Sequence, residues 1–570
     1  MVAVAADAAV EEETGTGTDA EAPVDAAPPR VDKLDVLFVV DNSFGMASKQ
    51  RAVAGGIARF FGQIAATDIH VGVISSTIDQ GGDICDRSRG NNGDSGRLLN
   101  RTHFGADAGP SVHGAEAGFL SLGPGGSVPD MATLEERAKE LVLGADEYGC
   151  GIESPLEAMY RFVAQPDPPL RFTIDSAARA EPTGVDYALL AERRAFFRPD
   201  SAVVILIVSD EDDASIDPRA LGGLGYGFAS LRFPYSQVSR PVAALGTTAP
   251  RGTSACATDP FSADCRSCIR ARDCDPSEPA CAAVRADAEC KTSPVDGQSG
   301  EGFDGFVAPD DDHLNLRGFD MKRRFGVEAR YPIERYVAAL TRRQVPNRAS
   351  EHPRPSMAAA PAPYEQATNC DNPLFSTGLP AKEGDELCAL PPGPRDPRRV
   401  VLGILAGAPP GLVSPAPDWT KLLGQGGFES DDTTGLDPHM LPSSLPRAGL
   451  GGADLPLGDN GTDPVHGREW TTRNTDLQFA CTFALPVPED CMRVACICGG
   501  RPEDNFPLCS GPGNTTQVRA KAYPGIRLLR FARQLGEQGA VGSVCGADTE
   551  GSYGAFLEAL GRRVAGRLAE

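Results

Sequence analysis

The chain has 570 residues, of which 41% are hydrophobic and 23% are charged, values that are typical of a folded globular protein. Its 54 basic and 78 acidic residues give a formal net charge of −24 at pH 7. This acidic excess argues against nucleic acid or an anionic membrane surface as a partner, because both attract basic proteins. The sequence also lacks an apolar run of about 18 residues, so it predicts no transmembrane segment.

Residues 1–32 consist mainly of Ala, Glu, Asp, Thr and Pro and have almost no large apolar side chains. Such a segment cannot form a core, so we expect a disordered acidic tether that spaces an exported domain from a membrane. It contains no Cys that could accept a lipid, so an N-terminal membrane anchor is not visible in this sequence. A signal peptide is not visible either, because the first residues lack a basic start and a sufficient apolar core.

Residues 36–40 are five consecutive apolar residues, which predict a central strand covered on both faces. Asp41 and Ser43 follow this strand directly, and Gly45 comes two residues later. Oxygen-bearing side chains just past the carboxyl end of a strand lie where doubly wound sheets bind ligands. Apolar residues at helical spacing within 53–64 then predict an amphipathic helix.

Residues 68–75 predict the next strand, and Ser154-Pro155-Leu156-Glu157 marks the start of a helix further along the chain. Ser is a preferred cap, Pro suits the first helical position, and Glu at the third completes a capping box. We therefore expect Ser154 to cap this helix, which leaves Glu153 available as a ligand.

Residues 202–208 form a second apolar strand, which ends in Ser209-Asp210-Glu211-Asp212-Asp213. Adjacent carboxylates repel one another, so this run predicts a positive group nearby, either a cation or a basic ligand. A solvated acidic loop is the simpler alternative. Since the two strand ends should lie at one edge of a parallel sheet, Asp41, Ser43 and Asp210 indicate a divalent-cation site.

Later segments supply further strands and helices. Helical spacing is found in residues 332–340, 526–535 and 556–568, and short strand-like runs are found at 400–405 and 540–545. This alternation predicts an α/β fold with a doubly wound, mostly parallel sheet and helices on both faces.

The two late strands are too few to make a stable sheet of their own. We therefore expect one discontinuous domain over residues 33–570 that is interrupted by two large, loop-rich insertions. Its predicted parts are the core segments 33–245, 326–406 and 525–570 and the insertions 246–325 and 407–524. A compact N-terminal domain followed by an independent C-terminal domain is the alternative.

The insertions hold most of the 16 cysteines, six in residues 246–325 and five in 407–524. Segments this polar do not fold by burial alone, so disulfide staples are expected, together with export to the periplasm, the outer membrane surface or the extracellular space. A zinc site would be the alternative for Cys265, Cys268 and the two cysteines that follow them. Their spacing and the absence of a nearby His favour disulfides.

The segment 36–46 and the acidic end of the strand 202–208 together resemble the von Willebrand factor A (VWA) domain. The metal-ion-dependent adhesion site (MIDAS) of that family uses an Asp-x-Ser-x-Ser loop plus Asp and Thr from other loops. The resemblance implies a Rossmann-like fold and a divalent cation, Mg²⁺ or else Mn²⁺ or Ca²⁺, held by Asp41, Ser43 and Asp210.

The sequence departs from the family pattern at two positions. Gly45 stands where the family has Ser, so one hydroxyl ligand is missing and a water would have to replace it. The segment 149–154 has no Thr, and Glu153 is the candidate substitute. In the alternative interpretation, Asp41 caps the following helix and no metal binds.

Signatures of enzymes are absent from the sequence, which contains no H-E-x-x-H, G-x-S-x-G or G-x-x-x-x-G-K-[ST] motif. His439 and His466 lie in loop-like surroundings, and the turn Asp459-Asn460-Gly461-Thr462-Asp463 lacks the spacing of an EF-hand. A hydrolase housed in the insertions is the least favoured hypothesis.

The leading hypothesis is a non-catalytic, exported, lipoprotein-like protein of the cell-adhesion type. The resemblance implies that it binds a protein partner or another acidic ligand, whose acidic group completes the coordination of the cation. The alternative is a structural scaffold of the cell envelope with a decayed metal site, which Gly45 and the missing Thr favour.

Overall fold

The computed structural model describes residues 31–569, except for residues 86–92, 104–110, 237–247, 276, 293–304, 309–310, 354–361, 427–431, 453–460, 495, 501–506, 511–512 and 547–548. Residues 1–30 of the predicted tether lie outside the described residues, as do Asp459 and Asn460.

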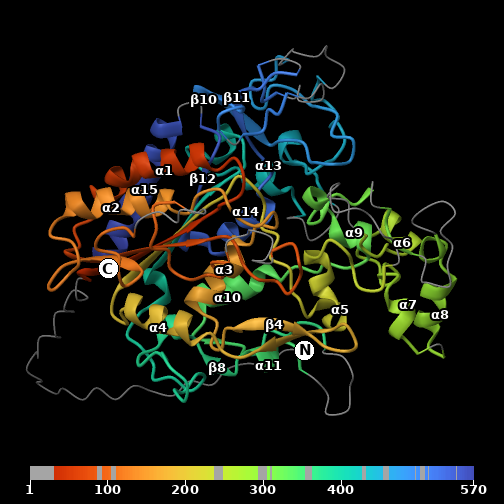
Figure 1. Cartoon of the computed structure of the whole chain (residues 1–570), viewed down its shortest axis with the longest axis horizontal. Coiled ribbons are helices and arrows are strands. Elements are labelled where there is room, and N and C mark those ends of the chain that lie inside the picture. The colour runs from red at the N-terminus through yellow and green to blue at the C-terminus, as the bar shows by residue number, and fades with distance from the viewer. Residues whose placement is uncertain are drawn as a thin grey trace, which may run out of the picture.

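A six-stranded sheet lies at the centre of the fold (Figure 1). All neighbouring strands in it are parallel except the edge strand β3, which is antiparallel to β2. In spatial order the strands are β12 (Gly539–Ser543), β9 (Val400–Ala406), β6 (Ala202–Val208), β1 (Lys33–Val40), β2 (Asp68–Ser75) and β3 (Phe119–Leu122). The prediction of an α/β fold built on a mostly parallel sheet is confirmed, whereas β3 was not predicted.

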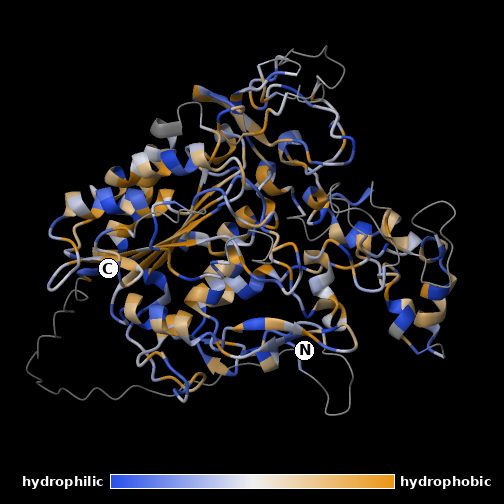
Figure 2. Cartoon of the chain, in the orientation of Figure 1, coloured by the Kyte–Doolittle hydropathy of each residue, from blue (hydrophilic) through white to orange (hydrophobic). Residues whose placement is uncertain are grey.

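The central strands are apolar and buried because helices cover both faces of the sheet. Every residue of β6 and β9 is buried, and Figure 2 shows the strands in the hydrophobic colour. One face carries α1 (Ala47–Phe61), α2 (Met131–Leu143) and α15 (Thr549–Ala569), and the other carries α3 (Pro155–Val163), α4 (Tyr187–Phe196), α10 (Ile333–Thr341) and α14 (Ile526–Gln534) (Figure 1).

Helices α1 and α15 pack closely although they lie at opposite ends of the chain. A Cβ atom added at Gly56 would lie 2.6 Å from Leu557 Cδ1 and 3.4 Å from the backbone of Gly554. Glycine at residue 56 thus allows this close approach, because a larger residue would have to displace the Leu557 side chain. The contact ties the last helix of the chain to the first.

The remaining helices and strands are short and lie mainly in the loop-rich segments. Two antiparallel pairs, β4 with β5 and β7 with β8, lie outside the central sheet, and β10 with β11 forms a ribbon in the second insertion. These elements are β4 (Arg171–Ile174), β5 (Ala180–Thr183), α5 (Ala220–Gly223), α6 (Ser254–Thr258), α7 (Arg270–Asp273), α8 (Pro279–Ala286), α9 (Met321–Phe325), β7 (Gln344–Val345), α11 (Arg348–Glu351), β8 (Cys370–Asp371), α12 (Pro410–Val413), α13 (Trp419–Leu423), β10 (Cys481–Asp490) and β11 (Thr516–Ala522).

All sixteen cysteines form disulfides, which confirms the prediction of disulfide staples. The zinc alternative for Cys265 and Cys268 is wrong, because each of them and of the two cysteines that follow is bonded to another cysteine. The pairs are Cys85–Cys150, Cys256–Cys265, Cys268–Cys290, Cys274–Cys281, Cys370–Cys388, Cys481–Cys545, Cys491–Cys496 and Cys498–Cys509. Eight disulfides are typical of an exported protein.

No helix in the described part of the chain has both the length and the apolar character needed to cross a bilayer.

A buried ion cluster joins α3, α10 and α11 on the sheet face that α3 and α10 cover. Arg335 of α10 contacts Glu157 of α3 and lies 2.8 Å from Glu351 of α11, and its guanidinium lies 3.6 Å from the ring centroid of Tyr160. One guanidinium thus serves two carboxylates away from water. Burial, and then the charge of Glu351, raise the pKa of Glu157 to about 7, although Arg335 opposes the shift.

We predict that Glu157→Gln changes the pH dependence of folding stability. A carboxyl with a raised pKa in the folded state stabilises the protein below its unfolded pKa, near 4.5, and this stabilisation is lost as pH rises towards 7. As the pH rises from about 4.5 to 7, the wild type should therefore lose up to about 3 kcal/mol of unfolding free energy relative to the variant. Urea unfolding across this range measures the difference, and the exposed Glu558→Gln is the control. A difference that does not vary with pH would contradict the prediction.

We also predict that residues 33–235 do not fold alone. That fragment lacks β9 and β12 and the covering helices α10, α14 and α15, so β6 would become a long apolar edge with a bare face. Thermal unfolding followed by circular dichroism should show no cooperative transition for the fragment. The chain shortened only to residues 31–570 should unfold cooperatively. A soluble, cooperatively unfolding 33–235 fragment would show that the C-terminal elements form a separate domain.

Candidate functional site

The register of the sheet brings three strand ends to the same edge. Val40 of β1 pairs with Ser75 of β2 and with Val208 of β6, so the residues that follow these strands lie side by side. The predicted ligands Asp41 and Asp210 therefore come from neighbouring loops.

Asp41 is fully buried, and hydrogen bonds fix its carboxylate. Its Oδ1 accepts from the backbone N–H of Ser43 at 2.7 Å, and its Oδ2 accepts from the hydroxyl of Ser209 at the end of β6. Ser43 Oγ is itself buried and has no hydrogen-bond partner among the described residues. The first loop thus presents a fixed carboxylate and an unused hydroxyl.

Glu153 is also buried and lies at the same edge, as the sequence predicted for a ligand. The hydroxyl of Ser76, just past β2, donates to its Oε2, whereas Oε1 has no partner within the described part of the chain. Burial, and then the charges of Asp41 and Glu211, raise the pKa of Glu153 well above its usual value. Glu153 therefore belongs to the same group of buried carboxylates, although among the described residues Asp41, Glu153 and Asp210 do not bring their carboxylate oxygens within 4.8 Å of one another.

A buried lysine, which the sequence analysis did not assign to the site, contacts Asp210. Lys49 Nζ lies 2.7 Å from Asp210 Oδ2 and donates to the carbonyl oxygen of Gly45 at 2.7 Å, and both side chains are almost completely buried. Asp210 Oδ1 has no partner among the residues described. The positive charge expected near the acidic run is therefore supplied in part by the protein itself.

Two other basic side chains lie beside Glu211 and Asp213 of the acidic run. Lys521 of β11 lies 3.6 Å from Glu211, and Arg527 of α14 lies 3.1 Å from Asp213. The run is therefore an ion network, and the interpretation as a solvated acidic loop is wrong for Asp210 and Asp213, which are fully buried.

The network nevertheless remains short of positive charge around Asp41. Burial, and then the charge of Asp210, raise the pKa of Asp41 to about 6. Burial also raises the pKa of Glu211 to about 7, although Lys521 opposes this shift. Raised carboxyl pKa values mean that the site holds protons, or another cation, near neutral pH.

The backbone explains why residue 45 is Gly. Gly45 has φ of +101°, a conformation that a Ser would adopt only with strain. An added Cβ would meet nothing closer than Ile497 Cδ1 at 3.9 Å, so conformation rather than space excludes a side chain. Its N–H and that of Ala47 donate to Glu147 Oε1 at 2.8 and 2.9 Å. Glu147 thus binds the start of α1, and the alternative in which Asp41 caps that helix is wrong.

The expectation that Ser154 caps α3 with its side chain is also wrong. Its hydroxyl donates to the carbonyl oxygen of Ile152 and accepts from Gln80 at 2.7 Å. The first free N–H groups of α3 bond instead to Asp213 and Ser215, which lie far away in sequence. Tertiary acceptors have replaced the local capping box.

A cavity of about 1370 Å³ lies beside the acidic edge. Glu153 and Glu211 line it from the edge, Phe261 lines it from the first insertion, and Leu441 and Asp476 line it from the second. Glu153 therefore lies in the wall of a large space between the sheet and the two insertions, although its side chain is almost fully buried.

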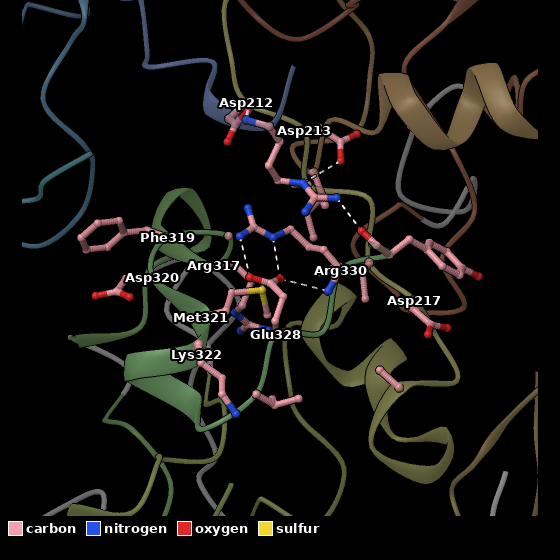
Figure 3. A pocket seen from close by; sticks show the side chains of 18 of the residues that line it. Asp212, Asp213, Asp217, Arg317, Phe319, Asp320, Met321, Lys322, Glu328 and Arg330 are labelled. Carbon is pink, nitrogen blue, oxygen red and sulfur yellow. Dashed lines mark hydrogen bonds and ion pairs between the residues drawn. The ribbon is translucent and has the colours of Figure 1, made fainter. Parts of the chain in front are cut away.

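The walls of the cavity carry paired charges. Glu328 and Arg330 point towards one another (Figure 3), with Nε–Oε1 and Nη2–Oε2 distances of 2.7 and 2.8 Å. Asp213, also labelled there, is the partner of Arg527. Because Arg330 and Arg527 are already paired with carboxylates of the cavity wall, they are not available to balance the charge of Asp41 and Glu153.

One sequence signal could have identified Lys49. It lies in the first turn of α1, where the helix dipole disfavours a positive charge. A lysine at such a position signals an anion nearby. The sequence around Lys521 gives no comparable signal, because only the tertiary fold brings this strand of the second insertion to the site.

Comparisons with known proteins provide no family assignment. No family model matches the chain, and no curated protein matches it. Among solved structures, the pilus adhesin RrgA from Streptococcus pneumoniae aligns at 14% identity over 32% of this chain and 20% of the adhesin, with a TM-score of 0.15. At this TM-score the likeness carries no argument about fold or function.

We predict that Lys49→Met destabilises the metal-free protein by about 3–5 kcal/mol, because Asp210 would be left buried without its ammonium partner. The matched control is Lys33→Met, since Lys33 pairs with Asp200 at the same distance of 2.7 Å but on the surface. The control should cost less than about 1 kcal/mol. Urea unfolding measures both, and equal small losses would show that the Lys49–Asp210 pair does not stabilise the fold.

Proposed function

We propose that this protein is a non-catalytic, exported binding protein of the VWA type. It holds a divalent cation at the carboxyl edge of its central sheet and uses the cation to bind an acidic group of a protein partner. Asp41, Ser43, Glu153 and Asp210 are the proposed ligands, with waters completing the coordination of Mg²⁺ or Mn²⁺.

One observation carries this proposal. Ser43 Oγ, Glu153 Oε1 and Asp210 Oδ1 are buried without hydrogen-bond partners among the described residues, and they belong to three of the four proposed ligands. Each buried polar atom left without a partner costs about 1–3 kcal/mol. A hard cation would reach these oxygens in part through its waters, and its charge would favour the ionised forms of Asp41 and Glu153, whose pKa values are raised by burial and then by neighbouring negative charge.

The surroundings of the edge support a protein as the partner. Phe44, next to Ser43, is 44% exposed, and Tyr148, on the loop whose Gly149 bonds to Asn42, is 52% exposed. Aromatic side chains are enriched in the central contacts of protein interfaces. An acidic side chain of the partner would reach the cation between these aromatic rings and the cavity.

A structural scaffold of the cell envelope is the second candidate, and Lys49 favours it. An ammonium 2.7 Å from Asp210 can replace a metal as the counter-charge of that carboxylate. In this case the acidic edge stabilises the fold and binds no ion.

Isothermal titration calorimetry with Mn²⁺ and Mg²⁺ distinguishes the two candidates. We expect binding to the full chain at millimolar metal or below, and a loss of at least tenfold in affinity in Asp41→Asn, whose amide cannot supply the ligand charge. The control is Asp130→Asn, because Asp130 caps α2 on the surface and Asn caps equally well. No heat from the wild type, or equal heat from Asp41→Asn, would support the scaffold.

A further inference from the structure

A second cluster of potential ligands lies in the second insertion and is not part of the acidic edge. It consists of His439, in a short turn, and of Asp463 and His466, which lie one turn apart further along the chain. His466 is fully buried, whereas the side chains of His439 and Asp463 are 12% and 16% exposed. The cluster is therefore shielded on one side and open to small ions on the other.

The three side chains converge on one point. His439 Nε2 lies 3.1 Å from Asp463 Oδ2, and His466 Nδ1 lies 2.9 Å from Asp463 Oδ1. One ligand atom from each residue lies within 4.8 Å of the others. Ligand atoms around a four-coordinate metal with bonds of about 2.0–2.1 Å have separations in this range.

Outer carboxylates hold both imidazole rings. His439 Nδ1 lies 2.8 Å from Asp437 Oδ1, and His466 Nε2 lies 2.7 Å from Glu469 Oε1. Glu469 is buried and is fixed in turn by Arg447 at 2.7 Å. A histidine that donates its outer N–H to a carboxylate and turns its inner nitrogen to a metal is the usual arrangement in metalloproteins.

The inner nitrogens are the critical feature. Each ring has a carboxylate at its outer nitrogen, Asp437 for His439 and Glu469 for His466. The inner nitrogens, His439 Nε2 and His466 Nδ1, both face Asp463, at 3.1 and 2.9 Å. His466 Nδ1 is buried and forms no aligned hydrogen bond with any described residue. A cation between these atoms would be bound by all three side chains, with the outer carboxylates holding the rings in place.

From this geometry we propose a binding site for Zn²⁺, or a similar first-row transition metal ion, formed by His439 Nε2, His466 Nδ1 and Asp463. Two imidazoles and one carboxylate favour such ions over Mg²⁺ and Ca²⁺, which prefer oxygen ligands alone. Asp463 Oδ1 already accepts from the N–H groups of Val465 and His466, so Oδ2 is the freer ligand atom.

The position of the site in the chain suggests its role. Residues 407–480 contain no cysteine, whereas disulfides staple residues 256–290 of the first insertion and residues 491–509 of the second. A metal that joins residue 439 to residues 463 and 466 would cross-link the cysteine-free part in the same way, by restricting its unfolded state. The site is independent of the proposed function of the sheet edge.

The test uses the full chain, dialysed against a weak chelator, and measures bound zinc by mass spectrometry and visible absorption after substitution with Co²⁺. We expect one equivalent of zinc and the absorption bands of a four-coordinate Co²⁺ site. Asp463→Asn removes the ligand charge but keeps an oxygen for the two backbone N–H groups, and His439→Gln removes one nitrogen. Each should weaken zinc binding at least 100-fold.

Two controls assign the metal to this site. His113→Gln alters an exposed His–Glu pair elsewhere and should bind zinc like the wild type. Asp41→Asn should also keep its zinc, which separates this site from the sheet edge. If a variant fails to fold, the proposal is tested on the wild type alone, whose melting temperature should be higher with added zinc than with EDTA. Less than one equivalent of zinc in the wild type, or unchanged binding in both ligand variants, would overturn the proposal.

Discussion

The parallel pairing of β6 with β9 is the contact on which the rest of the fold depends. Val208 pairs with Leu405 across an interval of nearly two hundred residues that includes the whole first insertion. Without this pairing β9 and β12, which pair with each other, would be separated from the other four strands of the sheet. The helices α10, α14 and α15 would then have no completed sheet to cover. A distant pairing of two fully apolar strands thus gathers a loop-rich chain around one core.

The same parallel register creates the electrostatic problem of the sheet edge. Parallel strands end together, so the carboxylates that follow β1 and β6 are forced into proximity and away from water. Two buried lysines partly balance this charge. Lys49, at the start of α1, pairs with Asp210, and Lys521, in the second insertion, lies beside Glu211. These ammonium groups lie beside Asp210 and Glu211, but burial still leaves Asp41, Glu153 and Glu211 with raised pKa values. The residual negative charge is what makes this edge a candidate for a cation.

The two insertions solve a different problem, because they are polar and cannot be held by burial alone. Covalent cross-links do much of this work, and Cys481–Cys545 also ties the ribbon of β10 and β11 to the end of β12. Phe483 and Ala520 of the ribbon pack into the same apolar cluster as the sheet. The second insertion is thus fixed against the core, which allows Lys521 to reach the acidic edge. The proposed His439–Asp463–His466 metal site would extend this stapling to the part that lacks cysteines.

By itself, the sequence determined the features that depend on neighbouring residues. Runs of apolar residues defined β1, β6 and β9, and the residues directly after β1 and β6 marked the acidic edge, because strand period and strand ends are local properties. The number and clustering of cysteines predicted disulfides, although not their pairing, which depends on which loops meet. Whether the resemblance to the VWA family extends to a bound metal stays a prediction.

Only the tertiary structure decided which groups face one another. Lys49 meets Asp210, Glu147 binds the start of α1, and Asp213 takes the role expected of Ser154, all through contacts between residues far apart in sequence. Local propensity cannot reveal such partners, since a buried polar group is satisfied by whichever donor or acceptor the packing brings within reach. For the same reason His439 and His466 read as loop residues in the sequence, and only the fold placed their rings 4.9 Å apart around one carboxylate.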